Sequence, residues 1–352
     1  MLLWKLTLAY DGTNYNGWQI QPNQPTIQGT LAQAIEHVTG ESVLPQGSGR
    51  TDAGVHALAQ VATFSIAAPI PAANLLRALN RALPPSIRIL SAEPAAAGFH
   101  ARHSALRKTY EYRIFPRVPY PIAIPPMVDR ICSPMLAPYV WDCHLPLDFA
   151  ILQNAADYIR GTHDFTSFAA VDPDLTTRNT HGTEDTSPQA EIPSPTQDTS
   201  SQPKTPNPTQ DTSSQPKTPN PTHDTSSRPE AKPERRDPCI LPEAPTPSRT
   251  RAFLERARHP HSMHTANPEP PSNIRTIYHS SWHRHDGLFI YRVTGNGFLH
   301  HMVRNLVGTF VEAAARRLSA DDIPAILAAR NRSAAGPTAP PQGLFLVPVE
   351  YE

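Results

Sequence analysis

A proline-rich stretch between Asp172 and Ser272 constrains the fold of this chain most. It contains 20 of the 41 prolines in the 352 residues. Within it, residues 197–209 and 210–222 carry the same 13-residue unit, QDTSSQPKTPNPT. A repeat without an apolar face cannot bury a hydrophobic core when its copies stack. We therefore predict a low-complexity, disordered insert at residues 172–272 that separates two segments of ordinary globular composition.

The charge of the chain divides in the same way. The chain has 31 Lys and Arg residues against 31 Asp and Glu residues, and the insert holds 11 and 14 of these, which leaves 20 against 17. This small positive surplus permits a phosphate-binding face but does not indicate one by itself.

Cysteine usage and the N-terminal residues bear on redox chemistry and location. The three cysteines, Cys132, Cys143 and Cys239, have no CxxC spacing, so neither a zinc site nor a disulfide framework is indicated. Lys5 and Asp11 interrupt any apolar core of signal-peptide length, and no run of about 18 apolar residues occurs. We expect a cytoplasmic protein without membrane association.

The hydrophobic pattern predicts a mixed fold. The first hundred residues read strand, helix, strand, helix, strand, which is typical of an α+β sandwich with helices on one face of a sheet. Thr26 is a possible N-cap, Ser319 and Asp322 form a capping box, and Asp286-Gly287 predicts a hairpin. The predicted strands lie at 2–10, 55–64, from 87, 274–283, 288–294 and 343–351, and the helices at 26–40, 71–83, 147–160, 298–317 and 321–330.

The stretch from Gly47 to Phe64, GSGRTDAGVHALAQVATF, places charged residues in a glycine-rich turn. The glycines predict a loop, and the residues after it predict a buried strand, so Arg50 and Asp52 should lie at the mouth of a sheet. From composition alone, an exposed ion pair on a surface turn is the simpler interpretation.

Two other segments combine features that suit RNA. Residues 99–113 place basic residues around Tyr110 and Tyr112, so cations could meet phosphates while rings stack on bases. A solvated, positively charged strand face is an equally good interpretation of this segment. In the loop 10–21, Trp18 and two glutamines could contact bases, or the tryptophan could fill the core.

The residues RTDAGVHA at 50–57 resemble the signature of the tRNA pseudouridine synthase A family. Further blocks resemble the same family: YDG…GWQ.Q near the N-terminus, FHAR.SA…Y.Y, the short DF.SF strand within 163–170, GNGFLHHMVRNLVGT, and a C-terminal GL.L..V.Y strand. The resemblance implies two related α/β sandwich halves that share a central, mostly antiparallel sheet, formed by residues 1–105 and by 106–171 with 273–352. It also implies a homodimer.

The resemblance further implies an activity and its residues. Family members isomerise uridine to pseudouridine at positions 38, 39 and 40 in the anticodon stem-loop of tRNA. Asp52 is then the catalytic nucleophile, and Arg50 is the cation that takes the place of the flipped base. Tyr110 is expected to pack on the target uracil, and Arg304 is expected to face Asp52.

The chemistry requires no cofactor, because isomerisation involves neither redox change nor transfer to an external group. The sequence contains no P-loop and no GxGxxG. We expect no metal at His300-His301, since adjacent histidines on a helix should diverge, nor at His279 and His283, which alternate on a strand without a carboxylate partner.

Two alternatives belong to other classes of protein. A catalytically silent RNA-binding protein of the same fold should lack the aspartate, whereas Asp52 is present. An aspartic-protease turn needs Asp-Thr/Ser-Gly, whereas Ala53 follows Asp52.

Overall fold

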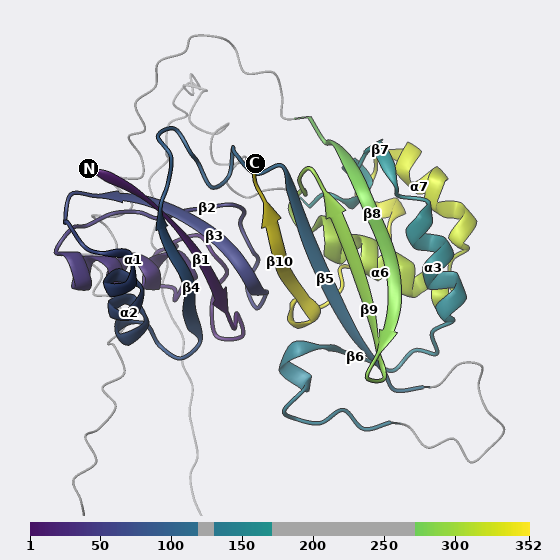
Figure 1. Ribbon diagram of the computed structural model, residues 1–352. Coiled ribbons are helices and arrows are strands. Elements are labelled where there is room, and N and C mark those ends of the chain that lie inside the picture. Colours follow the sequence, from purple (N-terminus) through teal and green to yellow (C-terminus); the bar gives the residue numbers. More distant parts are fainter. Residues whose placement is uncertain (119–129, 171–271) are drawn as a thin grey trace, which may run out of the picture. The chain divides into compact units, whose positions relative to one another are not determined.

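The computed structural model describes residues 1–118, 130–170 and 272–352 (Figure 1). The insert predicted at 172–272 lies outside the described residues, apart from its last position. The described residues belong to one compact unit. None of the helices within these ranges is both long and apolar enough to cross a membrane.

A ten-stranded sheet forms the centre of the described part of the chain. Its main path runs β4-β1-β3-β10-β5-β9-β8-β7, with β2 beside β3 and β6 beside β5 (Figure 1). The pairs β3–β10 and β5–β6 are parallel and the others are antiparallel. The strands are β1 (Leu2–Tyr10), β2 (Gln46–Gly47), β3 (His56–Ile66), β4 (Ile87–Pro94), β5 (Arg107–Pro116), β6 (Trp141–Cys143), β7 (Gly161–Asp164), β8 (Ile274–His285), β9 (Leu288–Gly295) and β10 (Leu344–Glu350).

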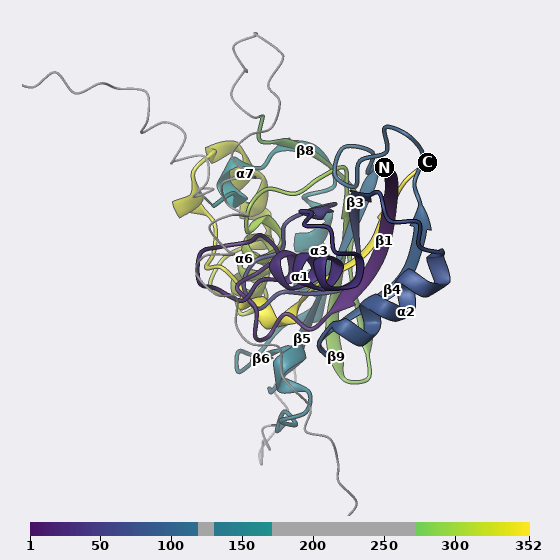
Figure 2. The same cartoon turned by 90° about the vertical axis from the view of Figure 1, so that its left-hand side faces the viewer.

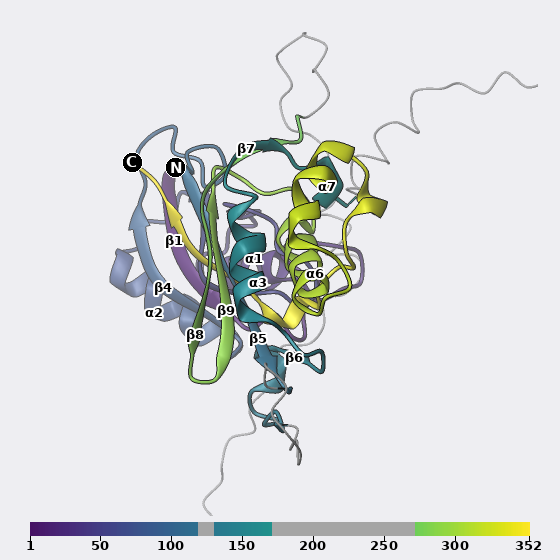
Figure 3. The same cartoon turned by 90° about the vertical axis from the view of Figure 1, so that its right-hand side faces the viewer.

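Two groups of helices pack beside this sheet. The first group is α1 (Ile27–Thr39) and α2 (Ala72–Ala82), which lie beside β1 and β4 (Figure 2). Helix α2 packs on β4 and on α1. In the second group, α3 packs on β8 and α6 packs on α3, while α7 contacts β7 (Figure 3). The α-helices are α1 (Ile27–Thr39), α2 (Ala72–Ala82), α3 (Phe149–Asp157), α6 (Met302–Ala314) and α7 (Ile323–Ala329). The expected mixed fold with a large, mostly antiparallel sheet is confirmed, whereas the proposed boundaries between two halves stay a prediction.

Local signals in the sequence explain several element ends. The Thr26 side chain caps α1 by accepting from the Gly29 amide, and Gly40 ends the helix with φ 75°. Asp286 and Gly287 join β8 to β9 with φ values of 48° and 74°, as a tight hairpin turn requires. The capping box at Ser319 is formed, although it opens a single 3₁₀ turn (Ala320–Asp322) before α7.

Two predicted elements are shorter than expected. The strand predicted at 163–170 ends at Asp164, because the Asp164 carboxylate accepts from the Thr166 amide and starts a 3₁₀ turn that buries Phe168. The helix predicted from Phe298 begins at Met302 instead, because His300 and His301 form a turn in which the Met302 amide donates to the Leu299 carbonyl and His301 has φ 57°. This second difference changes the geometry of the site.

Strand β10 occupies a central place in the sheet. Phe345 pairs with His56 on β3, and the same residue pairs with Glu111 on β5. The strand therefore connects β4, β1 and β3 on one side with β5, β9, β8 and β7 on the other. The two strands it joins are the ones that carry the Asp52 loop and Tyr110.

Candidate active site

Backbone hydrogen bonds with the loop 12–18 fix the Asp52 loop in place. The Trp18 amide donates to the Thr51 carbonyl at 3.0 Å, and the Gly54 amide donates to the Tyr15 carbonyl at 3.1 Å. A Cβ on Gly17 would lie 2.5 Å from the Thr51 carbonyl oxygen, so only glycine permits this approach. The loop that carries Asp52 is thus fixed by contacts of its neighbours' backbone.

A buried hydroxyl pair fixes the same loop from the sheet. The Tyr10 hydroxyl lies 2.8 Å from Thr51 Oγ1, and both side chains are buried. Burial raises the pKa of Tyr10, so the phenol stays protonated. These contacts leave Asp52 itself at the pocket wall with 18% of its side chain exposed.

Arg304, on the first turn of α6, contacts this carboxylate. Arg304 Nη1 donates to Asp52 Oδ2 at 2.9 Å, and Nε of the same guanidinium donates to the Ala339 carbonyl at 2.8 Å. Only 13% of the Arg304 side chain is exposed. The structure therefore brings together the two residues that the sequence paired.

Tight packing of α6 fixes the position of Arg304. A Cβ on Gly308, one turn further along, would lie 1.7 Å from the Pro337 carbonyl oxygen. The Ala339 amide also donates to the Arg304 carbonyl at 3.1 Å. The helix and the segment before β10 are consequently in direct backbone contact, and the guanidinium has little room to move.

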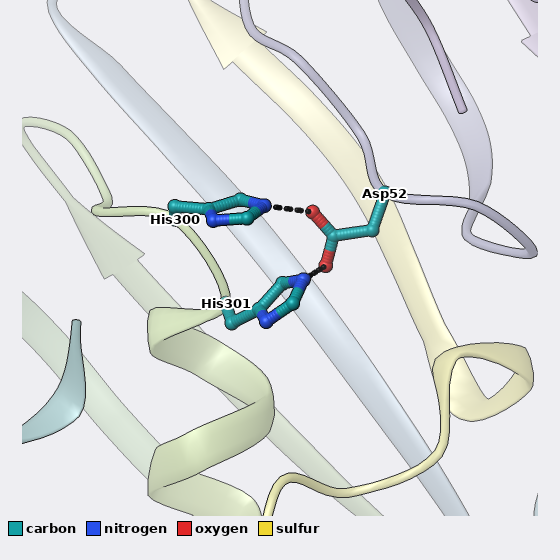
Figure 4. A group of neighbouring side chains, drawn as sticks. All are labelled: Asp52, His300 and His301. Atoms are coloured by element: carbon teal, nitrogen blue, oxygen red, sulfur yellow. Dashed lines mark ion pairs between the residues drawn. The ribbon is translucent and has the colours of Figure 1, made fainter. Parts of the chain in front are cut away.

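His300 and His301 also face Asp52, one toward each carboxylate oxygen (Figure 4). Nε2 of His300 lies 3.6 Å from Asp52 Oδ1, and Nε2 of His301 lies 3.4 Å from Asp52 Oδ2. The expectation that these histidines diverge is wrong, because they lie in the turn before α6 and not within the helix. The left-handed backbone of His301 directs both rings to the same side.

The surroundings lower the pKa of His301 in the free protein. Burial of the imidazole is the main cause, the positive charge of Arg304 adds to it, and the Asp52 carboxylate opposes it. His301 is therefore neutral at pH 7 and can donate one hydrogen bond.

Tyr110, on β5, lines the same pocket. The residue is 8% exposed, and its ring meets Phe298 edge to face, with centroids 5.0 Å apart. Burial raises its pKa, with Asp52 as a smaller contributor, so Tyr110 is a neutral phenol. A largely buried ring with one edge on a pocket is suited to pack against a planar ligand.

Arg50 lies on the Asp52 loop and lines the same pocket as an exposed residue. The pocket has a volume of about 510 Å³ and is open to solvent. All four residues selected from the sequence thus line this pocket or contact a residue that does. The lining includes Asn16, Gln19, Gln21, Arg50, Asp52, Arg102, Lys108, Tyr110, Phe298, His300 and His301.

The side chains of the loop 10–21 lie partly in the core and partly in the pocket. Trp18 is 3% exposed and packs against Gly47 and Tyr10, so the interpretation of this ring as core is correct. Gln19 and Gln21 line the pocket, and the Gln21 side-chain amide donates to the Asn16 carbonyl at 3.0 Å.

Asp52, His300 and His301 are the group in the described residues whose ligand atoms could surround a metal ion. Arg304 already contacts Asp52 Oδ2 at 2.9 Å, and its positive charge opposes a dication at that oxygen. The donor set is better suited to fix a carboxylate than to hold a metal, and we assign no metal to it.

The fold and the pocket together define a class of protein: an enzyme that presents a fixed carboxylate, among cations and a buried aromatic ring, to an anionic ligand. The sequence matches the tRNA pseudouridine synthase family over residues 7–104 and 258–352, more than half of the chain.

Individual proteins extend this similarity along the whole chain. A protein from Solibacter usitatus named tRNA pseudouridine synthase A is 36% identical over 348 residues, which cover 99% of this chain and 98% of that protein. A protein of the same name from Moorella thermoacetica is 35% identical over 351 residues, which cover 99% and 98%. The tRNA pseudouridine synthase A 1 of Protochlamydia amoebophila is 31% identical over 353 residues, which cover 100% and 97%.

The chain therefore belongs to the tRNA pseudouridine synthase family, and its enzyme class is that of an isomerase. The family and the enzyme class expected from the sequence are confirmed.

Proposed function

We propose that this chain isomerises uridine to pseudouridine at positions 38, 39 and 40 in the anticodon stem-loop of tRNA. Asp52 is the nucleophilic carboxylate in this proposal. The observation that supports it best is the Asp52–Arg304 ion pair at the wall of an open pocket lined by basic and aromatic residues. We also propose that the enzyme works in the cytoplasm as a homodimer, as the resemblance implies.

Arg304 has a clear role in this chemistry. The N1–C1′ bond of uridine must break and a C5–C1′ bond must form while the base stays in the pocket. A carboxylate that loses water when RNA fills the pocket needs a compensating cation, and Arg304 supplies it at 2.9 Å. His300 and His301 face the same carboxylate and limit its rotation.

Tyr110 and Arg50 serve the flipped nucleotide. Extrusion of a base from a stack costs a few kcal/mol. Packing on the Tyr110 ring contributes on the order of 1–3 kcal/mol toward holding the uracil. Arg50 lies on the same loop as Asp52 and is exposed, so its guanidinium can occupy the space that the base leaves.

The test is conversion of unmodified tRNA transcripts by the full chain, with pseudouridine measured at each position. Transcripts in which the uridine at 38, 39 or 40 is replaced by cytidine identify the site of conversion. Asp52→Asn should abolish product while tRNA still binds. The matched control is Asp157→Asn, since Asp157, at the end of α3, is an exposed carboxylate paired with Arg160.

Each outcome separates the alternatives. Product from the Asp52→Asn variant would remove Asp52 as the nucleophile. Binding without product from the wild-type chain would favour the second candidate, a non-catalytic RNA-binding protein of this fold.

A further inference from the structure

Lys108 is a cation of the pocket that the chemistry at Asp52 does not use. It lies on β5, two residues before Tyr110, and its side chain is partly buried. Its ammonium group donates to the Ser48 carbonyl. In the described part of the chain no carboxylate forms an ion pair with Lys108, so the contact to Ser48 leaves its charge uncompensated.

Two arginines lie in the same region: Arg102 shares the pocket with Lys108, and the Arg275 side chain packs beside Gly297, two residues after Gly295, which pairs with Lys108. Arg102, in the turn after β4, is exposed and lines the same pocket. Arg275, on β8, is partly buried, and its Nη1 donates to the carbonyls of Ser272 and Ile274. Neither arginine has a carboxylate ion-pair partner among the described residues.

The effect of these cations is visible in the pKa of Lys108, which is lowered to about 8. Burial is the main cause, and the charges of Arg102 and Arg275 add to it. The pKa of Arg275 is lowered as well, by burial and then by Arg102. Three neighbouring cations repel one another, and one of them is partly buried, which destabilises a protein unless an anion joins them.

The other groups around Lys108 do not supply that anion. The loop 47–50 contributes the Ser48 carbonyl and Arg50, and β5 contributes the neutral phenol of Tyr110. None of these groups is an anion. Both Lys108 Nζ and the Tyr110 hydroxyl lie beside Gly49, at 3.5 and 4.0 Å from the point where a Cβ would be. Lys108 is thus a neighbour of the residue proposed to hold the target base.

We propose that Lys108, Arg102 and Arg275 form a phosphate-binding subsite that holds the RNA backbone next to the nucleotide under conversion. This inference rests on the proposed function, since it names the part of the substrate that this side of the pocket binds. The phosphate replaces the missing counter-charge. It fixes the strand in the register that places its base against Tyr110.

Proton uptake on RNA binding distinguishes this subsite from a lysine that has only a structural role. In the free protein Lys108 loses its proton near pH 8, whereas a bound phosphate stabilises the ammonium and raises that pKa. RNA binding therefore takes up a proton above pH 8. If only the ammonium form binds, affinity falls about tenfold between pH 7 and pH 9. An arginine at this position stays charged throughout that range.

The experiment measures equilibrium tRNA binding by the full chain in an Asp52→Asn background, which prevents turnover. It compares Lys108→Met, Lys108→Arg and the control Arg77→Ala, in which an exposed cation of α2 outside the pocket is lost. Lys108→Met should weaken binding about tenfold and reduce the salt slope of log Kd by about one. The control should leave the slope and the pH profile unchanged.

The pH dependence separates a phosphate contact from a brace for the Ser48 loop. Lys108→Arg should retain binding at pH 9, and Lys108→Met should be weak but insensitive to pH. Should Lys108→Met not fold, the parent protein and Lys108→Arg still decide the question through proton uptake, measured by calorimetry in buffers of different ionisation enthalpy. Equal proton uptake by those two proteins, or an unchanged salt slope in Lys108→Met, would overturn the subsite.

Failure of the subsite and failure of the proposed function are distinguishable. A normal salt slope in Lys108→Met together with pseudouridine formation by the wild-type chain removes the subsite alone. The expected slope and pH effects without any pseudouridine formation retain the subsite and remove the proposed reaction.

Discussion

Arg304 and Asp52 are separated by 252 positions in the chain, yet one guanidinium nitrogen lies 2.9 Å from a carboxylate oxygen. The same guanidinium binds the Ala339 carbonyl, just before β10. Arg304 therefore ties the Asp52 loop to α6 and to the segment that leads into the central strand. The proposed nucleophile is oriented by elements from both parts of the sequence.

Replacement of Arg304 should impair catalysis more than folding. Arg304→Ala removes a charge-assisted hydrogen bond worth about 1.5–3 kcal/mol, which corresponds to roughly a 10- to 150-fold loss in kcat/KM. Arg304→Lys should lose less, because it keeps the charge but not the two-pronged contact. Single-turnover kinetics with tRNA check this, with thermal unfolding as the control for the lost Ala339 contact. Full activity of Arg304→Ala would contradict the role given to this pair.

His301 should titrate below its usual range, with consequences for stability. Because burial depresses its pKa, the unfolded chain binds the proton more readily than the folded one. The stability linked to this group is complete above about pH 6.5, and it is lost as the pH falls through that value toward the folded-state pKa. An NMR titration of the imidazole measures it directly.

Substitution of Asp52 tests whether its carboxylate affects the pKa of His301. Asp52 is the group that raises the pKa of His301, so Asp52→Asn should move the titration to still lower pH. For activity, His301→Asn is the informative variant, since asparagine tolerates the left-handed backbone of this position. The shorter asparagine amide should not reach Asp52 Oδ2, and loss of this contact should reduce kcat up to about tenfold. A His301 pKa unaffected by Asp52→Asn would show that the two groups do not interact.

Loss of the buried hydroxyl pair of Tyr10 and Thr51 should lower both the free energy of unfolding and kcat, because this pair fixes the Asp52 loop. Tyr10→Phe leaves Thr51 without this partner and should lower the free energy of unfolding by about 1 kcal/mol. The double variant with Thr51→Val should cost less than the sum of the two, measured by urea denaturation. Tyr15→Phe is the matched control, because its hydroxyl binds Ser86 and does not contact Thr51. It should lose comparable stability while kcat is retained.

The segment between the described ranges should be replaceable by a short linker. Asp164 on β7 pairs with Ile274 on β8, and the Phe165 amide donates to the Asn273 carbonyl at 3.1 Å. The flanking residues are therefore held together by the sheet itself, and loop length has a small entropic effect. Deletion of 175–270 should leave the unfolding temperature within a few degrees of the parent value. Insoluble protein from this deletion would mean that the segment contributes to folding.

Local sequence patterns were sufficient to predict those elements in which one face is buried. The alternation along β1, the cap at Thr26 and the Asp286-Gly287 turn each determine their structure within a few residues. The pairing of Asp52 with Arg304 could be expected only from the family resemblance. No periodicity links positions so far apart, because the contact depends on the whole sheet.

The histidines show why the rest of the site could not be predicted. A run of apolar residues at helical spacing after Phe298 suggests that the helix starts there. The chain instead turns at His301, whose positive φ is rare for residues other than glycine. The signal that could have been used is Gly295-Asn296-Gly297, since a turn that begins there can extend past Phe298. The convergence of Lys108 with Arg102 and Arg275 depends on tertiary packing in the same way.

The central place of β10 has a consequence for how the protein is made. The strand lies between β3 and β5, but it follows every other described strand in the chain. During translation the ribosome must therefore release residues up to about Glu350 before the sheet can close across its middle. Until then β10 does not join β3 to β5, so the nascent chain cannot assemble the pocket between the Asp52 loop and the strand that bears Tyr110 before β10 has left the ribosome.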